Sequence, residues 1–150
     1  MRAVVQRASG ASVRINGNQE RSIGPGMVIL LGIEHADELE DAKWLSRKIA
    51  GLRIFTDDAG KLNVSLNQVK GEIMIISQFT LHASIKKGTR PSYVRAAPPE
   101  QAKPLYEAFI KHLSEDAECR IVTGEFGAQM DVELVNNGPV TIIIDTKNRE

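Results

Sequence analysis

A run of small polar side chains follows the most apolar stretch of the sequence, and its residue types could support hydrolysis. Every position from 73 to 76 is apolar, which predicts a strand buried on both faces. The segment Ser77-Gln78-Phe79-Thr80 comes next, so hydroxyl groups, an amide and backbone N–H groups would stand at the rim of a core. Hydrolytic sites are often built this way. The alternative is that these side chains only satisfy neighbouring backbone groups, which is their commoner use.

The three histidines, His35, His82 and His112, are the other candidates for acid–base chemistry, and they are scattered along the chain. If the strand continued beyond Thr80, His82 would share a face with Thr80 and could act as a general base. A solvated surface histidine is the simpler interpretation. The sequence has no nucleotide-binding glycine motif, no His-Glu-x-x-His zinc motif and no Gly-x-Ser-x-Gly elbow. We therefore expect neither a metal ion nor a cofactor.

Length and composition favour a single soluble domain that spans residues 1–150. A chain of this length buries roughly 68–70% of its unfolded surface, which is enough for a substantial core. Lys plus Arg and Asp plus Glu each number 19, so any polyanion would have to meet a local patch. Cys119 is solitary, and neither a signal peptide nor a membrane span is recognisable. We therefore expect a cytoplasmic protein without membrane contacts.

The elements that would position the polar run suggest an α+β fold with a barrel-like, largely antiparallel sheet. A capping box formed by Asp37 and Glu40 predicts one helix, and Pro98 precedes a second, which Pro104 would delay or kink. These are the two main helices. Strands are expected at 2–8, 11–15, 27–33, 52–55, 73–76, 120–123, 130–135 and 140–144, with turns at 16–18, 57–60 and 136–139 and a loop at 86–92.

Two segments together resemble the paired signature of the D-aminoacyl-tRNA deacylase family. They are Ser77-Gln78-Phe79-Thr80-Leu81 and Asn137-Gly138-Pro139-Val140-Thr141. The similarity extends along the chain, because residues 1–7, 52–55, 60–63, 87–92 and 124–128 also match in order and spacing. Asn137 stands where the family usually has an acidic residue, and Ser84 where an aspartate is common. Neither departure removes a group to which the family's chemistry is assigned.

The resemblance implies an ester hydrolase of aminoacyl-tRNA. The family cleaves the bond between a D-amino acid, or glycine mischarged on tRNA(Ala), and the 3′-terminal adenosine, with the ribose 2′-OH helping to activate water. By resemblance, the backbone N–H groups of Phe79 and Thr80 would bind the oxyanion, and one such donor is worth about 3–4 kcal/mol. Ser77 and Gln78 would shape the adenosine pocket. The Thr80 hydroxyl as nucleophile is the competing mechanism.

The resemblance also implies a homodimer in which Gly138-Pro139 of one subunit, joined by a cis bond, enters the pocket of the other and rejects L-aminoacyl esters. Arg7 would hold this loop in place, and Asn137 and Met130 would complete the substrate-binding group. Judged from the residues alone, 136–139 is an ordinary hairpin turn, since Asn-Gly and Gly-Pro pairs mark turns anywhere.

The partner that the resemblance implies is tRNA, and no DNA partner is expected. Recognition of its acceptor end would rest on phosphates, the terminal adenosine and the ester. Two other classes stay open: a non-catalytic tRNA-binding module and a generic Ser/Thr esterase. The candidate phosphate contacts, each of which could instead be a solvated loop residue, are Arg53, Lys61, Lys86, Lys87, Arg90 and Arg95.

Overall fold

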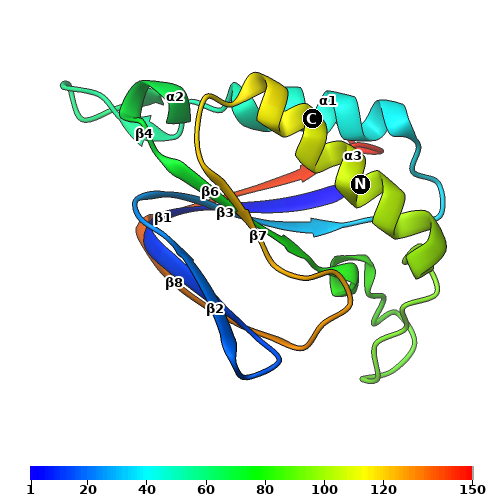
Figure 1. Ribbon diagram of the computed structural model, residues 1–150. Coiled ribbons are helices and arrows are strands. Elements are labelled where there is room, and N and C mark those ends of the chain that lie inside the picture. Colours follow the sequence, from blue (N-terminus) through cyan, green and yellow to red (C-terminus); the bar gives the residue numbers. More distant parts are fainter. Residues whose placement is uncertain (150) are drawn as a thin grey trace.

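Two long helices cover one face of a bent six-stranded sheet (Figure 1). The computed structural model describes residues 1–149. The strands lie in the order β2-β1-β3-β6-β7, and β8 also pairs with β1. The elements of this layer are β1 Arg2–Ile15, β2 Gln19–Ile23, β3 Gly26–Gly32, β6 Glu72–Ser77, β7 Ile121–Thr123 and β8 Met130–Asp145, with the helices α1 Leu39–Ala50 and α3 Pro99–Asp116.

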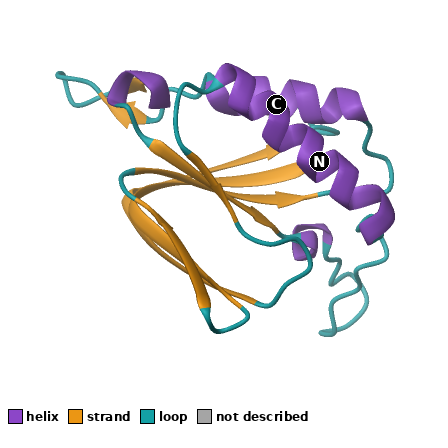
Figure 2. Ribbon diagram, in the orientation of Figure 1, coloured by secondary structure: helices purple, strands orange, loops and turns teal. Residues whose placement is uncertain are grey.

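The sheet curls because β1 is long enough to serve two groups of partners. Its first half pairs with β3 and its second half with β2, while β8 follows it along nearly its whole length, all in antiparallel register. The pairs β3–β6 and β6–β7 are parallel. Arg21 on β2 donates to the Thr123 carbonyl on β7 at 2.7 Å, so the two ends of the sheet come close together. The expected barrel-like, largely antiparallel α+β fold is thus confirmed (Figure 2).

The apolar strands separate two hydrophobic cores, which explains why they carry no polar face. On β6, Ile73 and Ile75 belong to the core beneath α1 and α3. Met74 and Ile76 alternate with them and belong to the second core, inside the curled part of the sheet. β3 divides its side chains in the same way. Alternation along a strand sends successive side chains to opposite faces, so burial of both faces requires a continuous apolar run.

Both long helices begin near the predicted places, although the capping box of α1 lies one residue further on than expected. Glu38 is the N-cap, and its backbone N–H donates to the Asp41 carboxylate at 2.9 Å. Asp37 instead accepts hydrogen bonds from the Met1 ammonium group and from the Glu34 N–H. α3 starts at Pro99 and continues through Pro104. Within residues 1–149, no helix combines the length and the apolar character that crossing a membrane requires.

Three strand predictions were wrong for one shared reason. The ends of a strand are set by the strands with which it pairs, and the local sequence does not identify those partners. The predicted strands 2–8 and 11–15 form the single strand β1, and those at 130–135 and 140–144 form β8. Both halves of β8 pair with β1 rather than with each other, so 136–139 is no hairpin turn. The strand expected at 52–55 is only β4 Phe55–Thr56, which pairs with β5 Leu62–Val64 ahead of the one-turn helix α2 Leu66–Val69.

Candidate active site

The polar run lies where β6 leaves the sheet. Pairing with β3 ends at Leu31 and Ser77, and the Gln78 N–H then donates to the Leu31 carbonyl at 2.8 Å. The chain turns directly into a short 3₁₀ helix, η1 Phe79–His82. The first N–H groups of such a helix have no acceptor within it. Those of Phe79 and Thr80 occupy these positions at the edge of the core, so they are donors available to a bound group.

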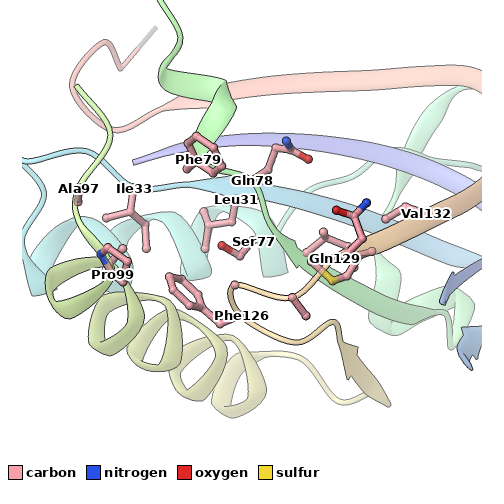
Figure 3. Close-up of a pocket in the computed structure, with 15 residues that line it drawn as sticks. Leu31, Ile33, Ser77, Gln78, Phe79, Ala97, Pro99, Phe126, Gln129 and Val132 are labelled. Carbon is pink, nitrogen blue, oxygen red and sulfur yellow. The ribbon is translucent and has the colours of Figure 1, made fainter. Parts of the chain in front are cut away.

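A cavity of about 530 Å³ opens beside this turn (Figure 3). It is bounded by the ends of β3 and β6, the start of α3 and the segment that leads into β8. Ser77, Gln78 and Phe79 line it, and so does Met130, whereas Thr80 does not. Its other lining residues are Leu31, Ile33, Ile76, Ala97, Pro99, Ala102, Phe126, Gly127, Ala128, Gln129 and Val132. The lining is largely apolar with a few polar groups, which is typical of a small-molecule site.

Thr80 stands just outside the cavity and is tied to its neighbour. The Gln78 side-chain amide donates to the Thr80 hydroxyl oxygen. This bond bridges the first residues of the turn, so it fixes the Gln78 side chain relative to the backbone N–H groups. Among residues 1–149, no cluster of three or more His, Cys, Asp or Glu side chains is suited to hold a metal ion.

His82 is buried, so its interpretation as a solvated surface residue was wrong. Only 1% of it is exposed, and neither ring nitrogen has a partner in hydrogen-bonding geometry within the described chain. Burial lowers the pKa of His82 below its usual value, although the nearby Gly32 backbone and Glu34 carboxylate favour the charged form. Thr80 and His82 also belong to a 3₁₀ turn and not to one face of a strand. His82 therefore packs beneath the turn and makes no hydrogen bond to a hydroxyl nucleophile.

The second signature forms a bulge in β8. Gln6 pairs with Thr141 and Ala8 with Asn136, so residues 137–140 lie opposite Arg7 alone and project from the sheet. The Gly138-Pro139 bond is cis. The φ angle of Gly138 is +124°, and a Cβ there would lie 2.8 Å from both the Arg7 Nη2 and the Val140 Cγ2. Only glycine fits this position without strain.

Arg7 fastens the bulge to the body of the protein. Its Nε donates to the Asn137 carbonyl at 3.0 Å and its Nη2 to the Asn137 side-chain oxygen at 3.3 Å. Its Nη1 donates to the Ile54 carbonyl at 2.8 Å and to the Thr56 hydroxyl at 3.2 Å. The predicted strand 52–55 would have paired the Ile54 carbonyl with a neighbouring strand, but this carbonyl accepts from the Arg7 side chain instead. One nearly buried guanidinium thus joins β1, the bulge and the chain before β5.

The two signatures do not meet within one chain. Asn137, Gly138 and Pro139 are exposed and do not line the cavity that Ser77 and Gln78 line. Residues that our sequence analysis did not single out complete the cavity, notably Phe126, Gln129 and Pro99. Figure 3 shows Ser77 between Phe126 and Gln129 in that view. The stretch 124–128 was noted for its similarity to the family, and Gly127, with φ of +79°, marks it as a tight turn. Nothing in its composition places it at the pocket.

The six candidate cations lie in two loops. Arg53 precedes β4 and donates to the Asn63 carbonyl at 2.7 Å, while Lys61 lies in the turn between β4 and β5. The other four follow η1 in the segment 83–97. Arg95 pairs with Glu34 at 2.9 Å, while Lys86, Lys87 and Arg90 are exposed.

Fold and pocket define a class: a small α+β protein with a barrel-like sheet and a concave, largely apolar site at the end of a doubly buried strand. Comparison with known proteins refines this class. The family model described as D-Tyr-tRNA(Tyr) deacylase matches residues 4–145. Relatives named D-aminoacyl-tRNA deacylase, from Bacteroides thetaiotaomicron and Akkermansia muciniphila, are 59% and 54% identical over 150 residues, with all of each chain covered.

Two solved structures are also similar. One is titled c-Myc DNA Unwinding Element Binding Protein, with a TM-score of 0.90, 41% identity and coverage of 97% of this chain and 98% of that one. The other, a probable eukaryotic D-amino acid tRNA deacylase, has a TM-score of 0.79 over 95% of this chain and 97% of its own; at 16% identity it shows the fold alone. The present chain belongs to the D-Tyr-tRNA(Tyr) deacylase family, and it is an enzyme, a D-aminoacyl-tRNA deacylase of the hydrolase class.

Proposed function

We propose that the protein is a chiral editing enzyme whose complete site is formed by two subunits. Its pocket would hold the terminal adenosine and ester of D-aminoacyl-tRNA, or of glycyl-tRNA mischarged on tRNA(Ala). The bulge at Gly138-Pro139 of the partner subunit would exclude L-aminoacyl esters. The observation that carries this proposal is the separation of the two signatures, because the exposed bulge lies outside its own chain's pocket.

The arrangement at η1 supports hydrolysis without a side-chain nucleophile. Water would attack the ester carbonyl carbon, and the backbone N–H groups of Phe79 and Thr80 would stabilise the oxyanion that develops. The C–O3′ bond then breaks, and the proton from water reaches the departing 3′ oxygen through the ribose 2′-OH. The competing mechanism needs a base beside Thr80, but the ring of His82 is buried and makes no hydrogen bond to that hydroxyl. The geometry therefore favours the amides.

The character of the cavity suits a nucleoside. At about 530 Å³ it lies within the usual range for small-molecule pockets, and Phe126, Met130 and Pro99 offer apolar surfaces to a base. Ser77 and Gln78 add hydroxyl and amide groups that could bind a ribose or the polar edge of adenine. A pocket of this kind contacts only the end of a tRNA and few of its phosphates. The chain therefore needs no large excess of cations, which agrees with its balanced overall charge.

Exclusion by steric clash suits chiral selection, because mirror-image substrates share every group that attractive contacts could recognise. Gly138 allows the backbone of the bulge to approach a ligand closely, and Arg7 fixes the direction in which it projects. A filter that acts on the side chain of an L-amino acid has nothing to exclude in glycine. Glycyl-tRNA should therefore be accepted together with D-aminoacyl-tRNA.

The free edge of β8 offers a surface for the second subunit. Within residues 1–149 this strand pairs only with β1, and Val135 and Ile143 are exposed along it. A two-fold symmetric contact would place each bulge against the other subunit, since an isologous interface makes every contact twice.

Mixing two inactive variants tests the shared site. Gln78→Ala removes a pocket side chain and Gly138→Ala distorts the bulge, so each homodimer should deacylate D-aminoacyl-tRNA poorly. After subunit exchange, a mixed dimer contains one intact pocket facing one intact bulge, and part of the activity should return. Absence of rescue, with exchange verified by mass spectrometry, would show that each site lies within one chain. Rates on matched D-, L- and glycyl-tRNA test the specificity.

A further inference from the structure

The segment 83–97 continues the wall of the pocket outward and presents an aromatic surface there. Phe79 lines the pocket, and its ring meets that of Tyr93 edge to face, with centroids 5.1 Å apart and planes at 71°. Although the rings pack against each other, Phe79 is 55% exposed and Tyr93 is 40% exposed. Exposed aromatic rings at the mouth of this pocket are available to stack on a planar group.

The same segment carries an unusual charge for a neutral chain. From Leu81 to Pro99 the sequence contains four cations and no Asp or Glu, while the chain as a whole has 19 of each sign. Arg95 is neutralised by Glu34. In the described part of the chain, no ion pair involves Lys86, Lys87 or Arg90. The loop that carries Tyr93 therefore also carries three exposed cations, which would attract a polyanion.

Backbone hydrogen bonds hold this segment in a defined shape. Ser84 and Ser92 exchange two of them, at 2.8 and 2.9 Å, which closes the base of the loop. Arg95 is held on both sides, because its carbonyl accepts from the His35 N–H at 3.2 Å and its side chain pairs with Glu34. The ends of the loop are thus fixed relative to the sheet, so binding here would not have to order the whole segment.

We propose that this loop binds the single-stranded nucleotides that precede the terminal adenosine, with one base stacked on Tyr93 and with Lys86, Lys87 and Arg90 contacting the backbone phosphates. Aromatic stacking combined with cations is the usual way in which proteins bind single strands without reading their sequence. Such binding suits an enzyme that meets one common 3′ end on many tRNAs. This inference rests on the proposed function, because it extends the same substrate beyond the pocket.

Two substrates that share the reacting ester but differ in length test the inference. One is D-aminoacyl-tRNA, and the other is the D-aminoacyl ester of adenosine alone, which reaches the pocket but not the loop. For Tyr93→Ala, kcat/KM on the tRNA substrate should fall at least fivefold, as expected for loss of one stacked base. On the adenosine ester it should stay unchanged. Tyr93→Phe, which keeps the ring, should match the parent on both substrates.

The phosphate contacts are tested by salt dependence. In the variant with Lys86→Ala and Lys87→Ala, the slope of log kcat/KM against log salt concentration should become shallower by about 1.4 for the tRNA substrate, because each phosphate contact to a single strand contributes about 0.7. A matched pair, Lys103→Ala with Lys111→Ala on α3, removes the same charge elsewhere and should leave the slope as it is.

Each of the other outcomes overturns the inference. Equal losses on both substrates would mean that Tyr93 only supports Phe79, and no loss on either would mean that the loop does not touch the substrate. A change in oligomeric state with unchanged kinetics on tRNA would make the loop a protein contact. If the parent enzyme itself fails to deacylate D-aminoacyl-tRNA, the proposed function fails, and this result is distinct from a parent that is active while Tyr93→Ala has no effect.

Discussion

The turn after β6 and the bulge in β8 carry the two signatures, yet the protein holds them in opposite ways. The turn is positioned from below, by a strand whose side chains fill both hydrophobic cores and by the buried ring of His82. The bulge is exposed and is held by polar contacts: two hydrogen bonds of Arg7 reach Asn137, the Asn137 amide donates to the Ser9 hydroxyl at 3.3 Å, and the Val140 N–H donates to the Asn136 side-chain oxygen at 3.1 Å. Many buried apolar contacts place the first region, whereas a few polar side chains place the second. Single polar substitutions should therefore damage the bulge far more than the turn.

The largest effect is expected for Arg7→Ala. The change leaves the Asn137 and Ile54 carbonyls without their donor, so unfolding free energy should fall by about 3 kcal/mol and deacylation by about 10²-fold or more. Urea denaturation and single-turnover rates measure both. Arg14→Ala on the same strand is the control, because its exposed pair with Glu20 should contribute less than about 1 kcal/mol. Near-normal activity in Arg7→Ala would mean that the bulge is placed without this residue.

Gly138→Ala should harm activity more than stability. The added Cβ would press on the Arg7 guanidinium and on Val140 at 2.8 Å, and the backbone angle disfavours any side chain. Because the bulge is exposed, it can shift without opening a core, so we expect a melting temperature close to that of the parent. Deacylation of D-aminoacyl-tRNA should fall roughly 10- to 100-fold, since misplacement by about 1 Å can cost this much. Gly17→Ala, at an open turn, should leave the rate unchanged.

As the pH falls, the stability of the protein should decrease first through His82, which packs beneath the turn after β6. Because burial lowers the pKa of His82 in the folded state, the unfolded chain takes up the proton first as the pH falls below about 6.5. Stability is then fully present above pH 6.5 and declines below it, by at most about 1.4 kcal/mol per pH unit, until the folded-state pKa is reached.

Urea denaturation between pH 7 and 5 measures this decline. His82→Gln should flatten it. Burial opposes the charged form of Asp41 and Asp145, but hydrogen bonds and nearby cations outweigh it and lower their carboxyl pKa values, so their contributions are lost only at more acidic pH. An identical acid slope in His82→Gln would show that His82 does not titrate in this range.

The smallest effect is expected for Thr80→Val, which keeps the shape of the side chain and removes only the hydroxyl group. The backbone N–H of residue 80 remains, so the rate should fall by less than the roughly 10²-fold that loss of one oxyanion donor costs. The Gln78 amide loses its acceptor, which should change the rate only a few-fold. A drop to background in single-turnover deacylation, with the fold intact by circular dichroism, would instead establish Thr80 as the nucleophile.

The sequence predicts best what local pattern determines. The continuous apolar run in β6 predicts burial on both faces, and this prediction is confirmed. The residues that α3 buries, among them Tyr106 and Phe109, likewise recur in the sequence at helical spacing. In each case the spacing of the side chains directly reflects the surface that they cover. The position of the polar run 77–80 also follows from local pattern, because the apolar run ends immediately before it and this marks the end of the buried strand.

The features that were missed depend on long-range pairing. Nothing local shows that 136–139 continues a strand, because the reason is its alignment with Arg7 on β1, about 130 positions earlier in the chain. The same holds for Phe126 and Pro99, which reach the pocket only because α3 and the segment before β8 converge on the end of β6. His82 looks like a surface residue until the turn that buries it is known.

The long free edge of β8 also has a consequence for the newly made chain. Met130–Asp145 contains no lysine or arginine, and it leaves Val135 and Ile143 exposed at 63% and 69%. An edge strand of this kind is a template for pairing with other strands, which natural proteins usually block with charge, with proline or with a cover. Here the carboxylates of Asp131 and Glu133 charge the first half of the edge and Pro139 interrupts it at the bulge, but no charged residue lies between Pro139 and Asp145. Chains that do not cover this edge soon after synthesis are therefore expected to aggregate, and solubility in the cell should depend on how fast the edge is covered.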